Sequence, residues 1–155
     1  MDAEVYPNER VARFVGENFI PVRVHVRDQA QEFQRLGARY SAQWTPTILV
    51  LDPDGTERHR VEGFLPVDDL IAQLALGLGH SAFVRGKFDE ATRHFGEVAD
   101  RHAGSEAGAE ATYWAGVSRY KATNDASALA DTAMRFREQY QDTSWAKKAS
   151  VWGGG

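Results

Sequence analysis

The sequence predicts an α/β domain followed by an all-helical extension. Apolar residues recur at spacings of three and four in residues 9–18, as on one face of a helix, and alternate along residues 19–26, as in a strand. An apolar run at residues 47–51 opens after a proline and closes with Asp-Pro-Asp-Gly, which predicts a buried strand followed by a tight turn. Beyond residue 77 strand signals vanish and alanine-rich helical periodicity takes over.

Six elements are expected in the α/β part, each from its own local pattern. In chain order they are a helix at 9–18 capped by Asn8, a strand at 19–26, a helix at 29–40, a strand at 47–51, a strand at 56–62 and a helix at 67–76. The turn around Asp54 and Gly55 joins the last two strands into a hairpin.

Composition narrows the classes of function. The chain has 155 residues, a formal net charge of -4 and no cysteine. A mildly acidic chain without a basic stripe is not expected to bind nucleic acid, and no apolar run reaches the roughly 20 residues of a membrane span. The first ten residues are acidic and lack an apolar core, so a secretory signal is not expected and the expected location is cytoplasmic.

The segment Trp44-Thr45-Pro46-Thr47 carries a resemblance to a known family. Thioredoxin-like proteins have a cis-proline segment that reads Thr-Pro-Thr before an apolar strand, and this chain resembles them over residues 1–76. Matching positions elsewhere are Phe14, Asn18 and Phe19 at the first helix-to-strand junction, Tyr40 and Ser41 before the proline, and the Gly63-Phe64 pair after the last strand.

The resemblance implies a cis Thr45-Pro46 bond and a binding ledge at Trp44, Thr45 and Pro46. In such families the residue before the proline exposes its backbone groups, which pair with an extended peptide by strand addition. The alternative is an inherited fold element that only shapes a turn. We expect no catalytic residues, no metal site and no cofactor. The five histidines lack metal-ligand spacing, and the sequence contains no phosphate-binding loop.

Thioredoxins use a Cys-x-x-Cys pair that this chain lacks, and this leaves two hypotheses for function. The first is a non-catalytic protein-interaction module, with a protein or peptide as partner. The second is the C-terminal portion of a thiol-disulfide oxidoreductase, because residues 1–6 resemble the second half of the helix that begins at the redox motif. Whether the protein is an enzyme therefore stays open: this chain has no cysteine for the reaction, but a longer native reading frame would make a thiol-disulfide oxidoreductase possible.

In the family's sheet, a central strand lies between the two strands that correspond to residues 19–26 and 47–51. This sequence has no counterpart of that central strand. Its loss would leave backbone groups unpaired. We therefore expect the two flanking strands either to pair directly or to form a homodimer through the open sheet edge.

Residues 77–152 resemble tetratricopeptide helix pairs, in which small residues sit where antiparallel helices touch. The first copy reads Gly79-x6-Gly86-x-Phe88-x2-Ala91-x3-Phe95-x2-Val98, and a weaker copy begins near Ala109. Serines at Ser105 and Ser144 are expected to cap the helices that follow them. The alternative is a plain helical bundle. The predicted division is a truncated thioredoxin-like domain at 1–76, tetratricopeptide-like helices at 77–152 and a flexible tail at 153–155.

Overall fold

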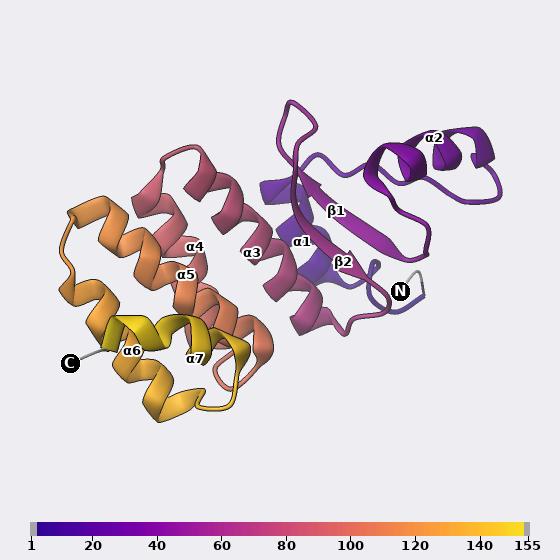
Figure 1. Ribbon diagram of the computed structural model, residues 1–155. Coiled ribbons are helices and arrows are strands. Elements are labelled where there is room, and N and C mark those ends of the chain that lie inside the picture. The colour runs from indigo at the N-terminus through magenta and orange to yellow at the C-terminus, as the bar shows by residue number, and fades with distance from the viewer. Residues whose placement is uncertain (1–2, 154–155) are drawn as a thin grey trace. The chain divides into compact units, whose positions relative to one another are not determined.

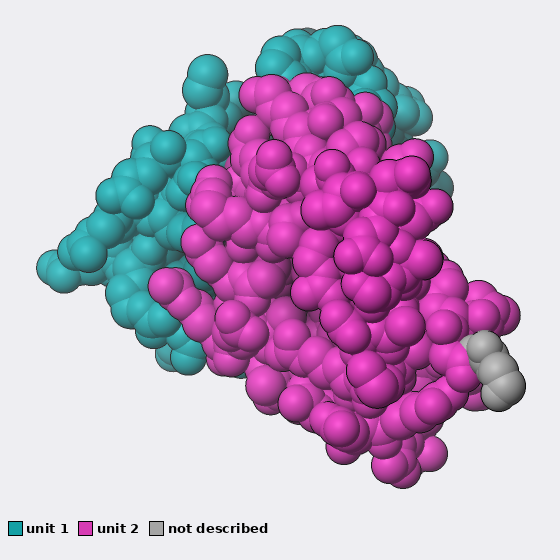
Figure 2. Space-filling model, turned by 90° about the vertical axis from the view of Figure 1, so that its left-hand side faces the viewer, with its two compact units in different colours: residues 1–71 teal, residues 72–155 magenta. Residues whose placement is uncertain are grey.

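The computed structural model describes residues 3–153, which divide into two compact units between Ile71 and Ala72. Figure 2 colours the first unit teal and the second magenta. The first unit holds two helices, a hairpin and the start of a third helix; the second holds the remaining helices (Figure 1).

The elements of the first unit follow the sequence pattern closely except at one segment. They are α1 at Glu9–Asn18, α2 at Ala30–Tyr40, β1 at Thr47–Leu51, β2 at Glu57–Glu62, and the first residues of α3 at Val67–Val84. The strands β1 and β2 pair antiparallel, with Ile48 opposite Val61 and Val50 opposite His59. The predicted hairpin is therefore confirmed.

Local capping explains where these elements begin and end. The Asn8 Oδ1 accepts a hydrogen bond from the Arg10 N–H at 2.9 Å, so Asn8 caps α1 as predicted. Ser41 ends α2 in the left-handed conformation, with φ of 53°. In the hairpin turn, Gly55 has φ of 83°, a conformation that glycine adopts without strain.

The core of the first unit is small and apolar. Its fully buried side chains come from the segment before α1, from α1, from both strands and from α3: they are Val5, Val11, Val50, Val61 and Leu70. Only one valine of each strand is fully buried, because a two-stranded hairpin has few inward-facing positions.

The prediction of a strand at residues 19–26 is wrong. The described residues form a sheet of two strands only, and residues 19–25 have no regular secondary structure. A strand needs a neighbour to satisfy its backbone, and no backbone hydrogen bond joins this segment to β1 among the described residues. Ile20 and Val22 are therefore left 93% and 80% exposed. The expected direct pairing of residues 19–26 with residues 47–51 is likewise wrong.

The helical segment expected at residues 1–6 is also corrected. Residues 3–7 form turns, and the first two positions of that prediction lie outside the described residues. Pro7 has no backbone N–H to donate to a helix, and Asn8 starts α1 afresh after it.

The second unit consists of helices throughout its described residues. After α3 come α4 at Phe88–Arg101, α5 at Glu106–Thr123, α6 at Ser127–Gln139, α7 at Ser144–Ala149 and the short 3-10 helix η1 at Ser150–Gly153. The main core cluster joins Leu76, Phe95, Val98 and several alanines, with Trp114 packed against it. A smaller cluster joins Phe136, Tyr140 and Ala149 to the partly buried Trp145 and Trp152.

Two glycines allow close helix contacts in this unit. A Cβ added at Gly79 of α3 would lie 2.6 Å from the Phe95 ring of α4. A Cβ added at Gly116 of α5 would overlap the Thr132 side chain of α6. Close helix approach at Gly79 matches its expected role. Gly86 differs from expectation, because its surroundings are open and its φ is 74°, so it serves the turn between helices.

Two helix boundaries differ from those predicted. The helix expected to end at residue 76 continues as α3 to Val84, because Gly77 and Gly79 lie in a buried stretch where packing outweighs the low helix propensity of glycine. Ser105 caps α5 as predicted, accepting from the Gly108 N–H at 3.0 Å. At α7 the cap is Thr143, one residue before the serine expected there.

The predicted fold class, a thioredoxin-like α/β domain followed by an all-α part, agrees with this architecture. None of the helices in the described part of the chain is long and apolar enough to cross a membrane. The predicted boundary between residues 76 and 77 stays a prediction, and it falls inside α3.

Replacing Gly79 by alanine is expected to lower the free energy of unfolding by about 1–3 kcal/mol, because the new methyl group must displace the buried Phe95 ring. Gly96→Ala is the matched control. No atom lies within 4 Å of a Cβ added there, so helix propensity alone should raise stability by about 0.4–1 kcal/mol. Urea denaturation of both variants measures the difference, and equal effects would argue against a close contact between α3 and α4.

Candidate functional site

The three predicted site residues form a short segment directly before β1. Trp44 is 69% exposed, Thr45 is exposed and Pro46 is half-buried. The Thr45-Pro46 peptide bond is cis. The large indole and the threonine that follows it are therefore open to an approaching molecule.

Hydrogen bonds fix the backbone on either side of Thr45. The Thr47 hydroxyl donates to the Trp44 carbonyl at 2.6 Å, and the Gly63 N–H donates to the Pro46 carbonyl at 2.8 Å. Within the described residues, the N–H and C=O of Thr45 make no hydrogen bond to the rest of the chain. One residue with free backbone groups thus lies between two that are held in place.

Arg60 on β2 forms hydrogen bonds with the C-terminal end of α2, which leads into the segment at residues 44–46. Its guanidinium donates to the carbonyl oxygens of Tyr40 and Ser41, the second at 3.4 Å. It also pairs with the carboxylates of Glu57 at 2.8 Å and Glu62 at 3.1 Å. These hydrogen bonds raise the pKa of Arg60 and lower the pKa of Glu57, so both groups stay charged at neutral pH.

Phe64 adds a second exposed aromatic ring at the same end of the hairpin. It follows Gly63, the residue that pairs with Pro46, and it is 57% exposed. The stretch around the Pro46–Gly63 hydrogen bond thus carries two large exposed aromatic side chains, Trp44 and Phe64. The sequence pattern marks Phe64 only as part of a Gly-aromatic pair and gives no sign of the role of Arg60.

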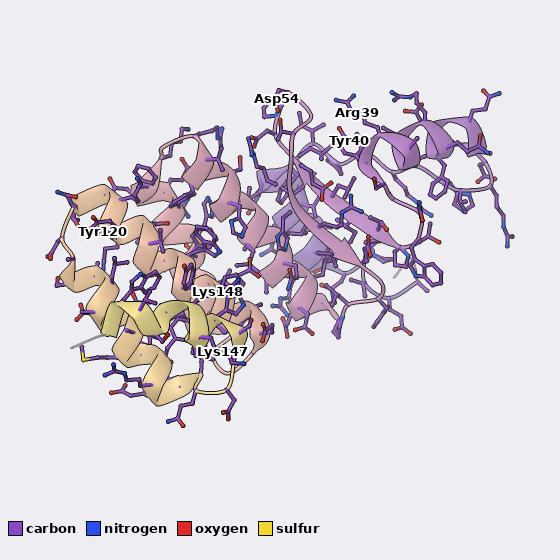
Figure 3. All side chains as sticks on the ribbon, in the orientation of Figure 1. Arg39, Tyr40, Asp54, Tyr120, Lys147 and Lys148 are labelled. Carbon is purple, nitrogen blue, oxygen red and sulfur yellow. The ribbon has the colours of Figure 1, made fainter. Side chains whose placement is uncertain are left out.

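The opposite end of the hairpin is closed by its own contacts. The Tyr40 hydroxyl donates to the Gly55 carbonyl at 2.9 Å, and the guanidinium of Arg39 lies 5.2 Å from the Tyr40 ring centroid. Figure 3 shows Arg39, Tyr40 and Asp54 at this turn. The Thr56 N–H donates to the Asp54 carboxylate and thereby lowers its pKa. These side chains hold the turn and offer no reactive group.

The outer edge of β1 also carries free backbone groups. The Pro46 carbonyl accepts from Gly63 and the Asp52 N–H donates to Thr56, so the even-numbered positions of the strand face β2. The N–H and C=O groups of Thr47, Leu49 and Leu51 therefore point away from it, and no described backbone group bonds to them.

The groups exposed at this segment are backbone hydrogen-bonding groups and aromatic rings. A thiol nucleophile is excluded by the sequence, which has no cysteine. What the segment at residues 44–46 offers is a pair of free backbone groups at Thr45 and the apolar surfaces of Trp44 and Phe64. An extended polypeptide supplies the complementary backbone groups and side chains.

Comparison with known proteins covers the first half of the chain. Residues 1–77 match the family described as a thioredoxin-like domain. This match supports a thioredoxin-like fold for the first part of the chain. No curated protein and no solved structure matches the chain.

Arg60→Met is expected to lower the free energy of unfolding of the first unit by about 1–2 kcal/mol, because two carbonyls and two carboxylates lose a charged donor. Arg13→Met on the exposed face of α1 is the control and should change stability little. Hydrogen exchange at the Ser41 and Ala42 amides, which donate to the Gly37 carbonyl, should accelerate in the first variant only. Unchanged exchange there would show that Arg60 does not hold this segment.

Proposed function

We propose that this chain is a non-catalytic protein-interaction module whose thioredoxin-like domain binds an extended segment of a partner protein. The observation that carries the proposal is Thr45, whose backbone N–H and C=O are exposed and unbonded between two anchored neighbours. A partner strand can pair with both groups without any rearrangement of the site.

The exposed rings support the same conclusion. Trp44 and Phe64 would cover the side chains of a bound segment, and aromatic residues of this kind supply much of the affinity at protein interfaces. The chain's lack of cysteine removes the redox chemistry of the family and leaves binding as the property of the scaffold.

We further propose that the helical part consists of tetratricopeptide-like pairs, α3 with α4 and α5 with α6. The glycine contacts support this, because Gly79 and Phe95 are as far apart in the chain as Gly116 and Thr132. Repeated small-residue contacts at equal spacing are typical of helical repeats and are not required in a plain bundle.

The helix caps repeat in the same manner. The backbone N–H and the hydroxyl of Ser105 both donate to the His102 carbonyl, and those of Thr143 both donate to the Tyr140 carbonyl. Each hydroxyl oxygen also accepts a hydrogen bond from the backbone N–H three residues later in the chain. This makes Thr143 the counterpart of Ser105, one residue before Ser144, the cap expected from the sequence.

Trp44→Ala is expected to weaken peptide binding by about tenfold or more, because it removes an exposed aromatic anchor beside the free backbone groups. Binding is measured on an array of immobilised short peptides of random sequence, probed with the labelled full chain. Met134→Ala on α6, which also trims an exposed apolar side chain, should leave the array pattern unchanged. If Trp44→Ala binds the same peptides as strongly as the original chain, the proposed ledge is wrong.

A second candidate is that the domain forms the C-terminal portion of a thiol-disulfide oxidoreductase. Residues 19–26 favour it: they alternate like a strand, yet Ile20 and Val22 are exposed and no described strand lies beside them. A further strand next to the Cys-x-x-Cys would give this segment a strand with which to pair. Coding DNA upstream of Met1 with an in-frame Cys-x-x-Cys would favour this candidate.

The chain by itself is expected to accelerate the reduction of insulin by dithiothreitol no more than a buffer blank does. Disulfide exchange requires a thiolate, and the chain has none. A version extended upstream through a Cys-x-x-Cys strand should reduce insulin faster than its Cys-to-Ser variant. If the extended version is no faster, the oxidoreductase candidate is excluded.

A further inference from the structure

Helix α4 buries one ionisable side chain, that of His94. The residue is only 8% exposed, and the other buried residues of α4 are alanine, valine and phenylalanine. Histidine is the side chain that changes its charge closest to neutral pH. The protonation state of this ring therefore decides whether the packed face of α4 carries a charge.

The contact with Arg93 identifies the neutral form of the ring. The Arg93 Nη2 lies 3.4 Å from the His94 Nε2. An arginine side chain can only donate, so Nε2 accepts and the ring proton lies on Nδ1. The same guanidinium donates to the Glu97 carboxylate at 3.4 Å, one turn further along α4. Arg93 thus bridges a neutral imidazole and a carboxylate.

A second partner lies close to the same ring nitrogen. The Glu90 carboxylate is 3.8 Å from the His94 Nε2, one turn earlier in α4. A proton on Nε2 removes the lone pair that accepts from Arg93 and places two positive charges side by side. The new N–H can donate to Glu90 instead. A single proton therefore decides between two arrangements of the ring, one with Arg93 and one with Glu90.

The surroundings favour the neutral arrangement. Burial lowers the pKa of His94 from its ordinary value and is the largest influence on it, and the charge of Arg93 lowers this pKa further. The carboxylates of Glu90 and Glu97 act in the opposite direction and do not outweigh burial. Charging the ring therefore costs free energy in the folded chain.

The neighbouring helices have ionic and ring contacts of their own. His80 of α3 and Glu110 of α5 bond to each other at 2.9 Å. Lys121 of α5 lies against the aromatic ring at the start of α4, and Arg135 of α6 bonds to an aspartate near its end. Within residues 3–153, the charged groups that shift the pKa of His94 all belong to α4 itself. The helix must therefore accommodate the added charge by itself.

We propose that His94 is a pH-sensitive switch in the second unit. Near neutral pH the ring is uncharged and accepts a hydrogen bond from Arg93. In mild acid it gains a proton and turns to Glu90, and α4 then carries a buried positive charge next to Phe95, whose ring packs against Gly79 of α3. Acid thereby loosens the helical unit. The switch does not depend on peptide binding at the ledge.

The sign of the effect follows from the lowered pKa of His94. Unfolding returns the ring to an ordinary pKa of about 6.5, so the unfolded chain binds this proton at a higher pH than the folded chain does. The stability that the neutral ring contributes is complete above that pH and is lost as the pH falls towards the lower pKa of the folded chain. Between pH 7.5 and pH 5.5, the unfolding equilibrium constant should rise by up to about tenfold through this residue.

Urea denaturation at both pH values tests the switch with His94→Gln, which keeps an acceptor for Arg93 but cannot take up a proton. The rise in the unfolding constant should be smaller in this variant than in the original chain, by about threefold to tenfold. His102→Gln is the matched control, because it removes a partly exposed histidine directly after α4 and should retain the original response. An unchanged pH response in His94→Gln would overturn the proposal.

A measurement on the original chain decides the matter if His94→Gln does not fold. In an NMR titration of the His94 imidazole, Nε2 should be unprotonated at pH 7 and should gain its proton below about pH 6.5. Hydrogen exchange at the α4 amides, corrected for its intrinsic pH dependence, should accelerate over the same range. A ring already charged at pH 7, or exchange that does not respond to its protonation, would contradict the switch.

Discussion

The first unit is governed by the need of every extended backbone group for a hydrogen-bond partner. In the described part of the chain β1 has a neighbour on one side only, so β2 satisfies half of its groups and the other half faces outward. The same need explains why residues 19–26, which alternate like a strand, do not form one. The most exposed apolar side chains of the unit, Ile20 and Val22, lie in that segment.

The second unit is not subject to this constraint, because helices satisfy their own backbone internally and need only side-chain packing. Its stability depends on how closely helices can approach, and Gly79 and Gly116 set that distance at two points. Phe95 fills the space beside Gly79 and is fully buried. The helical unit buries the large rings of Phe95 and Phe136, whereas the residues that flank the hairpin leave Trp44 and Phe64 exposed.

The proposed ledge at Trp44, Thr45 and Pro46 belongs to a stretch of backbone that continues directly into β1. Thr45 and the outer groups of β1 follow one another along a single stretch of chain, and Arg60 holds the start of that stretch to β2 through the end of α2. A rigid site of this kind loses little conformational entropy when a partner strand binds. The chain keeps a cis Thr45-Pro46 bond before β1 and has no cysteine thiol for disulfide exchange.

The sequence by itself determined the features that depend on near neighbours. Proline before residues 47–51 and Asp-Pro-Asp-Gly after them delimit β1, and side-chain caps at Asn8 and Ser105 start their helices, because these signals act over a few residues. The place of Trp44, Thr45 and Pro46 before the strand followed from the same local pattern.

Tertiary structure decided the features that depend on distant partners. Residues 19–26 have the alternation of a strand but no neighbour with which to pair, and α3 continues through Gly77 and Gly79 because packing outweighs propensity. The roles of Arg60 and Phe64 also come from residues brought close by the hairpin. Periodicity records which face of a segment is apolar, but whether that face is covered depends on what the folded chain places beside it.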